Sequence, residues 1–114
     1  MKKLLLLLNL MFISQFVFAQ SKMIMHTATA ENTFSDFSEI DHPDLNGNPN
    51  AGIIVTHNWN GMGTSGVYND HVTGVWYDSV SAKWCVFNQD TSPMVIGSKY
   101  NVLIGDPENF FIHT

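Results

Sequence analysis

The sequence predicts an all-β fold, a compact antiparallel β-sandwich or small β-barrel of six to eight short strands. Short runs rich in β-branched and aromatic residues recur along the chain. Turn-forming residues separate these runs at intervals of about 8–12 residues, the spacing that sandwiches and small barrels show. No segment has a convincing helical periodicity. These three observations together favour the all-β class.

Residues 1–19 are predicted to be a signal peptide. Lys2 and Lys3 precede an apolar run, which ends at Val17-Phe18-Ala19, a sequence typical of a cleavage site. The apolar run is shorter than the roughly 20 residues that a helix needs to span a bilayer. We therefore expect residues 20–114 to form a single domain that is secreted or periplasmic, with no membrane association after cleavage.

Composition restricts the partners of the domain. It has ten acidic residues, only three lysines after the leader, and no arginine. Such a surface repels nucleic acid and anionic lipid headgroups, so we predict that neither is a partner. Cys85 is the only cysteine, which rules out an intramolecular disulfide; we expect it to act as a small buried apolar residue.

Residues 22–29 are predicted to form the first strand. Their side chains alternate, so that Met23 and Met25 lie on one face and Ile24 and His26 on the other. Residues after this strand favour an irregular loop, held by two phenylalanine rings, and then a brief strand. These segments are residues 28–38, with Phe34 and Phe37, and residues 38–41.

The loop of residues 42–50 is dense in turn formers, and its Asn-Gly pair (Asn46-Gly47) favours a type I′ turn. Oxygen-bearing side chains occupy alternate positions in it, as in calcium-binding loops. The loop departs from the EF-hand pattern, because a proline stands where the turn glycine belongs and the twelfth position is not acidic. We expect its side chains to tie the loop to itself through Asx-turns. These side chains are Asp44, Asn46, Asn48 and Asn50.

Four further segments carry strand signals. Residues 52–58 form a continuous apolar run, which predicts a strand buried on both faces. After the glycine-rich loop of residues 61–66 and the hairpin described next, short strands are expected at residues 94–97, 100–104 and 110–113.

A β-hairpin is predicted for residues 72–77 and 84–89, joined by the polar loop 78–83. If Tyr77 pairs with Trp84, the antiparallel register follows. It places Val75 opposite Val86, Thr73 opposite Asn88, Trp76 opposite Cys85, Gly74 opposite Phe87, and Val72 opposite Gln89. The Phe87 ring would then cover the bare Gly74 backbone. Both faces near the loop are apolar, so we expect the hairpin to lie in the centre of a sheet.

Asparagine and aromatic residues recur together on both sides of the hairpin. An exposed ring beside amide or carboxylate groups can stack on a sugar and hydrogen-bond to it, or be buried at a protein interface. We therefore predict a binding or surface-interaction module with a glycan or protein ligand. The same asparagines could instead satisfy backbone groups inside the fold. The predicted ligand-binding residues are Asn58, Trp59, Asn60, Tyr68, Asn69, His71, Asn88 and Asp90.

No catalytic, metal or cofactor motif is present. The sequence lacks G-x-S-x-G, and none of its five histidines forms the H-x-H or H-x-x-x-H spacing of a metal site. Two alternatives to the binding module stay open. One is a small hydrolase or metal-dependent enzyme that uses His57, His71 and the nearby Asp70 or Asp90, and the other is a self-assembling structural subunit.

The sequence resembles a domain of unknown function found in secreted bacterial proteins. The resemblance rests on long strings that span nearly the whole of residues 20–114. They include Ile40-Asp41-His42-Pro43, Asn58-Trp59-Asn60, Gly66-Val67-Tyr68-Asn69, Gly74-Val75-Trp76-Tyr77 and Val86-Phe87-Asn88-Gln89-Asp90. It implies a compact exported domain and assigns no catalytic residue. It also favours binding over catalysis, because similar modules are appended to larger secreted proteins.

Overall fold

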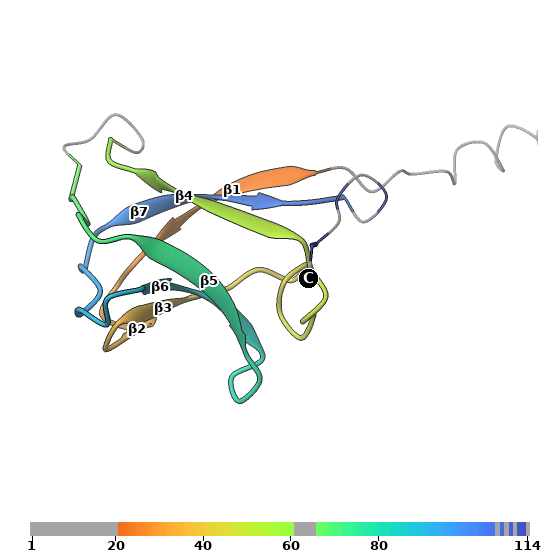
Figure 1. The fold of residues 1–114 in the computed structure, drawn as a ribbon, viewed down its shortest axis with the longest axis horizontal. Helices are drawn as coiled ribbons and strands as arrows, with labels where there is room; N and C mark the ends of the chain where they lie inside the picture. The colour runs from red at the N-terminus through yellow and green to blue at the C-terminus, as the bar shows by residue number, and fades with distance from the viewer. Residues whose placement is uncertain (1–20, 61–65, 107, 109, 111, 114) are drawn as a thin grey trace, which may run out of the picture.

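Figure 1 shows the computed structural model of the chain, which describes residues 21–60, 66–106, 108, 110, 112 and 113. The predicted signal peptide and most of the glycine-rich loop lie outside the described residues. Within the described part of the chain, no helix is long and apolar enough to cross a membrane.

Seven strands in two antiparallel sheets make up the described chain, and none of its residues is helical. Strands β1, β7 and β4 form one sheet in that order, and β2, β3, β6 and β5 form the other (Figure 1). The all-β prediction is confirmed, and the two sheets do not close into a barrel. The strands are β1 (Lys22–Thr27), β2 (Thr33–Phe34), β3 (Phe37–Ile40), β4 (Ile53–Asn58), β5 (Thr73–Asp78), β6 (Lys83–Asn88) and β7 (Lys99–Ile104).

The core lies between the two sheets. Its first cluster joins Ile40 and Trp84 of one sheet to Val102 and Ile104 of the other. Each strand buries one of its two faces in this core, because successive side chains of a strand point to opposite sides of the sheet. The Trp84 indole also donates to the Asn48 carbonyl at 2.9 Å, which ties the 41–51 loop to the core.

The hairpin register is confirmed for every pair between β5 and β6, including Tyr77 opposite Trp84 and Thr73 opposite Asn88. The Phe87 ring also covers Gly74, as expected: a Cβ added there would meet that ring at 2.8 Å. The prediction that the hairpin lies in the centre of a sheet is confirmed for only one of its two strands. β6 is an inner strand, but β5 is an edge strand.

Strand β4 is exposed on one face, contrary to the prediction of burial on both. It is the edge of its sheet, and the Ile54 side chain points outward and is exposed. Burial on both faces requires layers above and below a sheet, and this fold has only two layers. The alternating faces of β1 are as predicted, with Met23 and Met25 exposed and His26 buried.

Four local predictions need correction. The loop at residues 28–38 contains the two-residue strand β2, which pairs with β3 through Phe34 and Phe37. Residues 94–97 are not in a strand, and the last two of them, Ile96 and Gly97, lie in a turn. The Asn46-Gly47 turn is not of type I′, since only Gly47 has a positive φ, of 69°. The described residues of the 110–113 segment are not in a strand either.

Candidate functional site

An open cavity of about 580 Å³ lies between β4 and the segment that leads into β5. Its volume is within the range of small-ligand sites in proteins. Three side chains of β4 form one wall, and the other wall comes from residues just before and at the start of β5. The lining residues are Val55, Thr56, His57, Trp59, Asn69, Asp70, His71, Val72 and Thr73.

Two exposed aromatic rings are in contact beside this cavity: Trp59, which lines it, and the neighbouring Tyr68. Trp59 and Tyr68 are 51% and 64% exposed, and their rings pack edge to face with centroids 5.1 Å apart. The Trp59 ring also lies edge to face with His57, and the His57 ring in turn contacts the buried Tyr100. A chain of rings therefore runs from the surface into the core and holds Trp59 in place.

His71 lies between two carboxylates. Its Nδ1 is 2.6 Å from Asp90 Oδ2, and its Nε2 is 3.3 Å from Asp70 Oδ1. The Ser92 backbone N–H and then His71 hold the pKa of Asp90 below its ordinary value. Asp90 is therefore ionised at neutral pH, and it fixes the plane of the imidazole. Across the cavity, His57 Nε2 is 3.2 Å from the hydroxyl of Thr73.

A buried amide network holds the segment that carries Tyr68 and His71. The Asn69 amide donates to Asn88 Oδ1 at 2.7 Å and to the Tyr100 hydroxyl at 2.8 Å. The Asn88 amide donates to the carbonyls of Ser92 and Pro93. The side chains of Asn69, Asn88 and Tyr100 are all buried. Segments distant in sequence are thus joined beneath the cavity.

The predicted site residues separate into three groups. Trp59 and His71 line the cavity and are in contact with Tyr68 and Asp90, respectively. Asn69 also lines it, but its amide, like that of Asn88, bonds to other groups of the protein. The remaining pair lies at the end of β4: the Asn58 amide donates to Asn101, its Oδ1 accepts the Asn60 backbone N–H, and Asn60 is exposed.

Thr73 lines the cavity, and the sequence did not predict it as a site residue. The signal for it was present in the predicted register, which places Thr73 opposite Asn88 on the first pair of the hairpin. Val55 was also missed, because only the pairing of β4 with β7 shows which of its faces is turned inward.

Gly66 lies against the backbone of Trp59, and a Cβ there would occupy the position of the Trp59 carbonyl. Gly66→Ala is therefore expected to push the two segments apart and to displace Trp59 from Tyr68, at a cost of about 1–2 kcal/mol in the free energy of unfolding. The loss of Trp59–Tyr68 packing can be followed as a shift in the indole NMR resonance. Gly47→Ala is the matched control: a Cβ at Gly47 meets nothing within 4 Å, so only its positive φ is strained. An unshifted Trp59 indole in Gly66→Ala would contradict the expectation.

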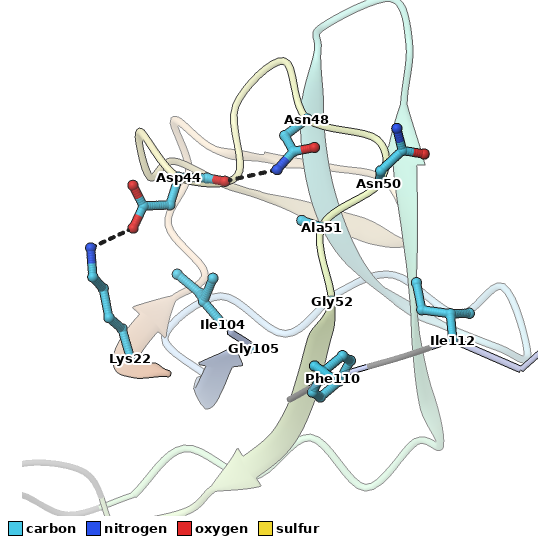
Figure 2. A pocket seen from close by; sticks show the side chains of 10 residues that line it. All are labelled: Lys22, Asp44, Asn48, Asn50, Ala51, Gly52, Ile104, Gly105, Phe110 and Ile112. Carbon is cyan, nitrogen blue, oxygen red and sulfur yellow. Dashed lines mark hydrogen bonds and ion pairs between the residues drawn. The ribbon is translucent and has the colours of Figure 1, made fainter. Parts of the chain in front are cut away.

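A second cavity, of about 440 Å³, lies beside the start of β4 and the end of β7 (Figure 2). The Phe110 ring packs against Gly52 and Gly105 on its apolar side. On its polar side, Lys22 Nζ is 2.6 Å from Asp44 Oδ2, and the Asn48 amide donates to the Asp44 carbonyl. Lys22 also lowers the pKa of Asp44.

Three of the four calcium-like side chains of this loop, Asp44, Asn46 and Asn48, bond within the protein. Asp44 is paired with Lys22, and the Asn46 amide donates to Asp41 Oδ1 at 2.7 Å. Asn46 Oδ1 accepts the His42 backbone N–H four residues earlier. This bond ties the loop to itself, but it is not the expected Asx-turn, in which the side chain bonds to the backbone two residues further on. Among the described residues, no group of three or more histidine, cysteine or acidic side chains is placed to hold a metal ion.

Comparison with known proteins gives one match. A family model described as "Domain of unknown function (DUF7452)" matches residues 12–104, which is most of the chain. No curated protein and no solved structure matches the chain.

Proposed function

The chain belongs to the DUF7452 family of domains of unknown function, and we propose that it is a binding module whose ligand occupies the cavity between Trp59 and His71. The observation that carries this proposal is the edge-to-face pair of Trp59 and Tyr68, two large rings left exposed beside polar groups. Contiguous exposed apolar surface often marks an interaction site, and a ligand that covered the exposed part of the two rings would remove it from water.

A neutral glycan is the ligand class that best fits the chemistry of this site. A sugar ring has one apolar face that can lie on the exposed face of Trp59. Its hydroxyl groups can donate to Asp70 and accept from Thr73 at the other wall. Two carboxylates, Asp70 and Asp90, flank the single imidazole of His71 and give the site an excess of negative charge. Anionic sugars and phosphates are therefore disfavoured as ligands.

The packing behind the rings supports binding without rearrangement. His57 and Tyr100 support Trp59 from below, and Asn69 is held by two hydrogen bonds. A site held in its binding geometry loses little conformational entropy when the ligand enters. We further propose that this module acts outside the cytoplasm, on the strength of the signal-peptide pattern in residues 1–19.

A hydrolase is the second candidate, because the cavity brings His57, Asp70 and His71 together and Asp90 orients the imidazole. The contacts of His71 favour a binding function over hydrolysis. Both of its ring nitrogens face carboxylates, Nδ1 toward Asp90 and Nε2 toward Asp70, so neither points freely to a substrate. A general base needs a nitrogen within hydrogen-bond reach of the proton that it takes.

The proposal is tested by screening the purified protein on an array of neutral and acidic glycans. Trp59→Ala is expected to weaken binding of any neutral hit at least about ten-fold. Phe34→Ala is the matched control, since it removes a half-exposed ring from the opposite sheet. Binding that is indifferent to Trp59→Ala, or lost equally in Phe34→Ala, contradicts the proposed site.

The same glycan separates the two candidates. Incubation with the protein is expected to leave its reducing-end content unchanged. Release of reducing sugar that disappears in His71→Gln would support the hydrolase instead.

A further inference from the structure

The outer face of the β2-β3-β6-β5 sheet carries four aromatic side chains, three of which are in ring contact. Phe34 and Trp76 are 48% and 38% exposed, and Phe37 and Phe87 are partly exposed. Phe37 lies between Phe34 and Trp76, with ring centroids 5.9 Å and 5.5 Å away. Phe87 pairs with Phe37 across the sheet. We call these four residues the aromatic strip.

Carboxylates lie beside the aromatic strip on the same face. Glu39 and Trp76 both pair with Cys85 in the sheet, so the three share one row. The next row contains Asp78 opposite Lys83, and Lys83 Nζ lies 3.2 Å from Asp41 Oδ1. Three carboxylates against one ammonium group leave this end of the face with a charge of −2.

The Cys85 thiol lies in the same row as Glu39 and Trp76, and it is buried among the side chains of this face. Burial, followed by the negative charges of Glu39 and Asp78, raises the pKa of Cys85 to about 12. The thiol is therefore protonated at neutral pH and covered, and it is not a reactive group.

We propose that this face, the aromatic strip together with Glu39, Asp41 and Asp78, docks a protein segment that carries basic side chains next to apolar ones. An arginine or lysine can lie over Trp76 while it pairs with Glu39, which combines a cation–π contact with an ion pair. Apolar side chains of the same segment cover the phenylalanines.

Charge and ring geometry exclude the other occupants of a sheet face. A second copy of this chain is disfavoured because the chain has a formal net charge of −5 and is acidic on this face. Anionic membranes are repelled for the same reason. A flat polysaccharide needs coplanar rings, but the strip's rings are inclined by 38° and 78° to their neighbours.

The sheet fixes the spacing that such a segment must match. Rows on one face of a sheet are two residues apart, or about 7 Å. The aromatic row of Phe37 and Phe87 is followed by the Glu39 and Trp76 row and then by the Asp41, Lys83 and Asp78 row. A partner in the extended conformation with basic and apolar groups in adjacent rows fits this order.

The test is an NMR titration of the purified protein with the synthetic peptide Leu-Ser-Arg-Ser-Arg-Ser, whose leucine and arginines lie on the same side of an extended chain in adjacent rows. Shifts are expected at the amides of Glu39, Cys85 and Trp76 and not at the Trp59 indole. Glu39→Gln is expected to weaken the peptide about three-fold, and Trp76→Leu by a similar factor. Glu108→Gln, which removes the same charge from an exposed carboxylate outside this face, is the matched control and should leave affinity unchanged.

Several results would overturn the proposal. Equal weakening by Glu39→Gln and Glu108→Gln would reduce the effect to general attraction between an acidic protein and a cation. Equal binding of the peptide Leu-Ser-Glu-Ser-Glu-Ser, or of cellohexaose, at these amides would assign the face to another ligand. Shifts centred on Trp59 would move the peptide to the cavity. Each variant's amide dispersion reports whether it is folded, and Glu39→Gln, a surface change, keeps the test valid if Trp76→Leu unfolds.

Discussion

Asn88→Leu is expected to lower the free energy of unfolding by about 4 kcal/mol, although leucine is close to asparagine in size. The Asn88 side chain is fully buried and hydrogen-bonds to three groups at once. Its amide donates to the carbonyls of Ser92 and Pro93, and its Oδ1 accepts from Asn69. Each partner left unpaired inside the protein costs about 1–3 kcal/mol.

Urea unfolding followed by tryptophan fluorescence measures this loss, with the midpoint and slope compared at equal temperature. Asn60→Leu is the matched control, since Asn60 is exposed and the same change should alter the free energy of unfolding by less than about 0.5 kcal/mol. A loss below about 1 kcal/mol in Asn88→Leu would mean that water replaces the missing amide.

The same change should also weaken the proposed ligand site. Asn69 is held by Asn88 and Tyr100, and it lies between Tyr68 and Asp70 in the chain. When the hydrogen bond from Asn69 to residue 88 is lost, the segment that carries Tyr68 and Asp70 samples more conformations. The ligand must then order this segment when it binds, and the lost conformational entropy lowers its affinity. Ligand affinity and fold stability are therefore coupled through this buried amide.

The hairpin could be predicted from the sequence because its signals are local. Alternation of side chains, together with a polar loop of fixed length, determines the register of two consecutive strands. The edge positions of β4 and β5 could not be predicted. They depend on which strand closes each side of a sheet. Among the described strands, β4 pairs only with β7, whose partner residues lie between 41 (Asn58 to Lys99) and 51 (Ile53 to Ile104) positions further along the chain.

The candidate site was predictable in part for a similar reason. Trp59, Tyr68 and His71 are close in sequence, so their approach at one end of the fold required little long-range information. The burial of Asn88 did not follow from its residue type, because asparagine is usually exposed. The register offered the missing signal, since Asn88 shares a face with Val86 and Trp84, which line the core.

Stability is expected to fall by up to about 3 kcal/mol as the pH is lowered from 6.5 to 4, because of His26. Burial lowers the pKa of His26 from 6.5 to about 4. In that window the unfolded chain binds a proton that the folded chain does not, so the free energy of unfolding decreases. Above pH 6.5 the imidazole is neutral in both states and contributes no pH dependence.

The hydrogen bonds of His26 explain why the folded protein favours the neutral ring. The Ser38 hydroxyl donates its one proton to Asn32 Oδ1 at 2.9 Å. It must therefore accept at its 2.7 Å contact with His26, and Nε2 of His26 carries the donated proton. The neutral tautomer already satisfies this contact, so protonation of the buried ring adds a charge without a new partner among these residues.

His26→Gln keeps an N–H donor for Ser38 and removes the titration. Urea unfolding of both proteins at pH 7.5, 6.0 and 4.5 is expected to show a smaller decrease for the variant, with the difference growing as the pH falls. The pKa values of Asp41, Asp44 and Asp90 are also lowered, so their stabilising contribution is lost mainly as the pH falls to 3.8 and below, and this loss is common to both proteins. Parallel curves for the two proteins would place the acid sensitivity on titratable groups other than His26.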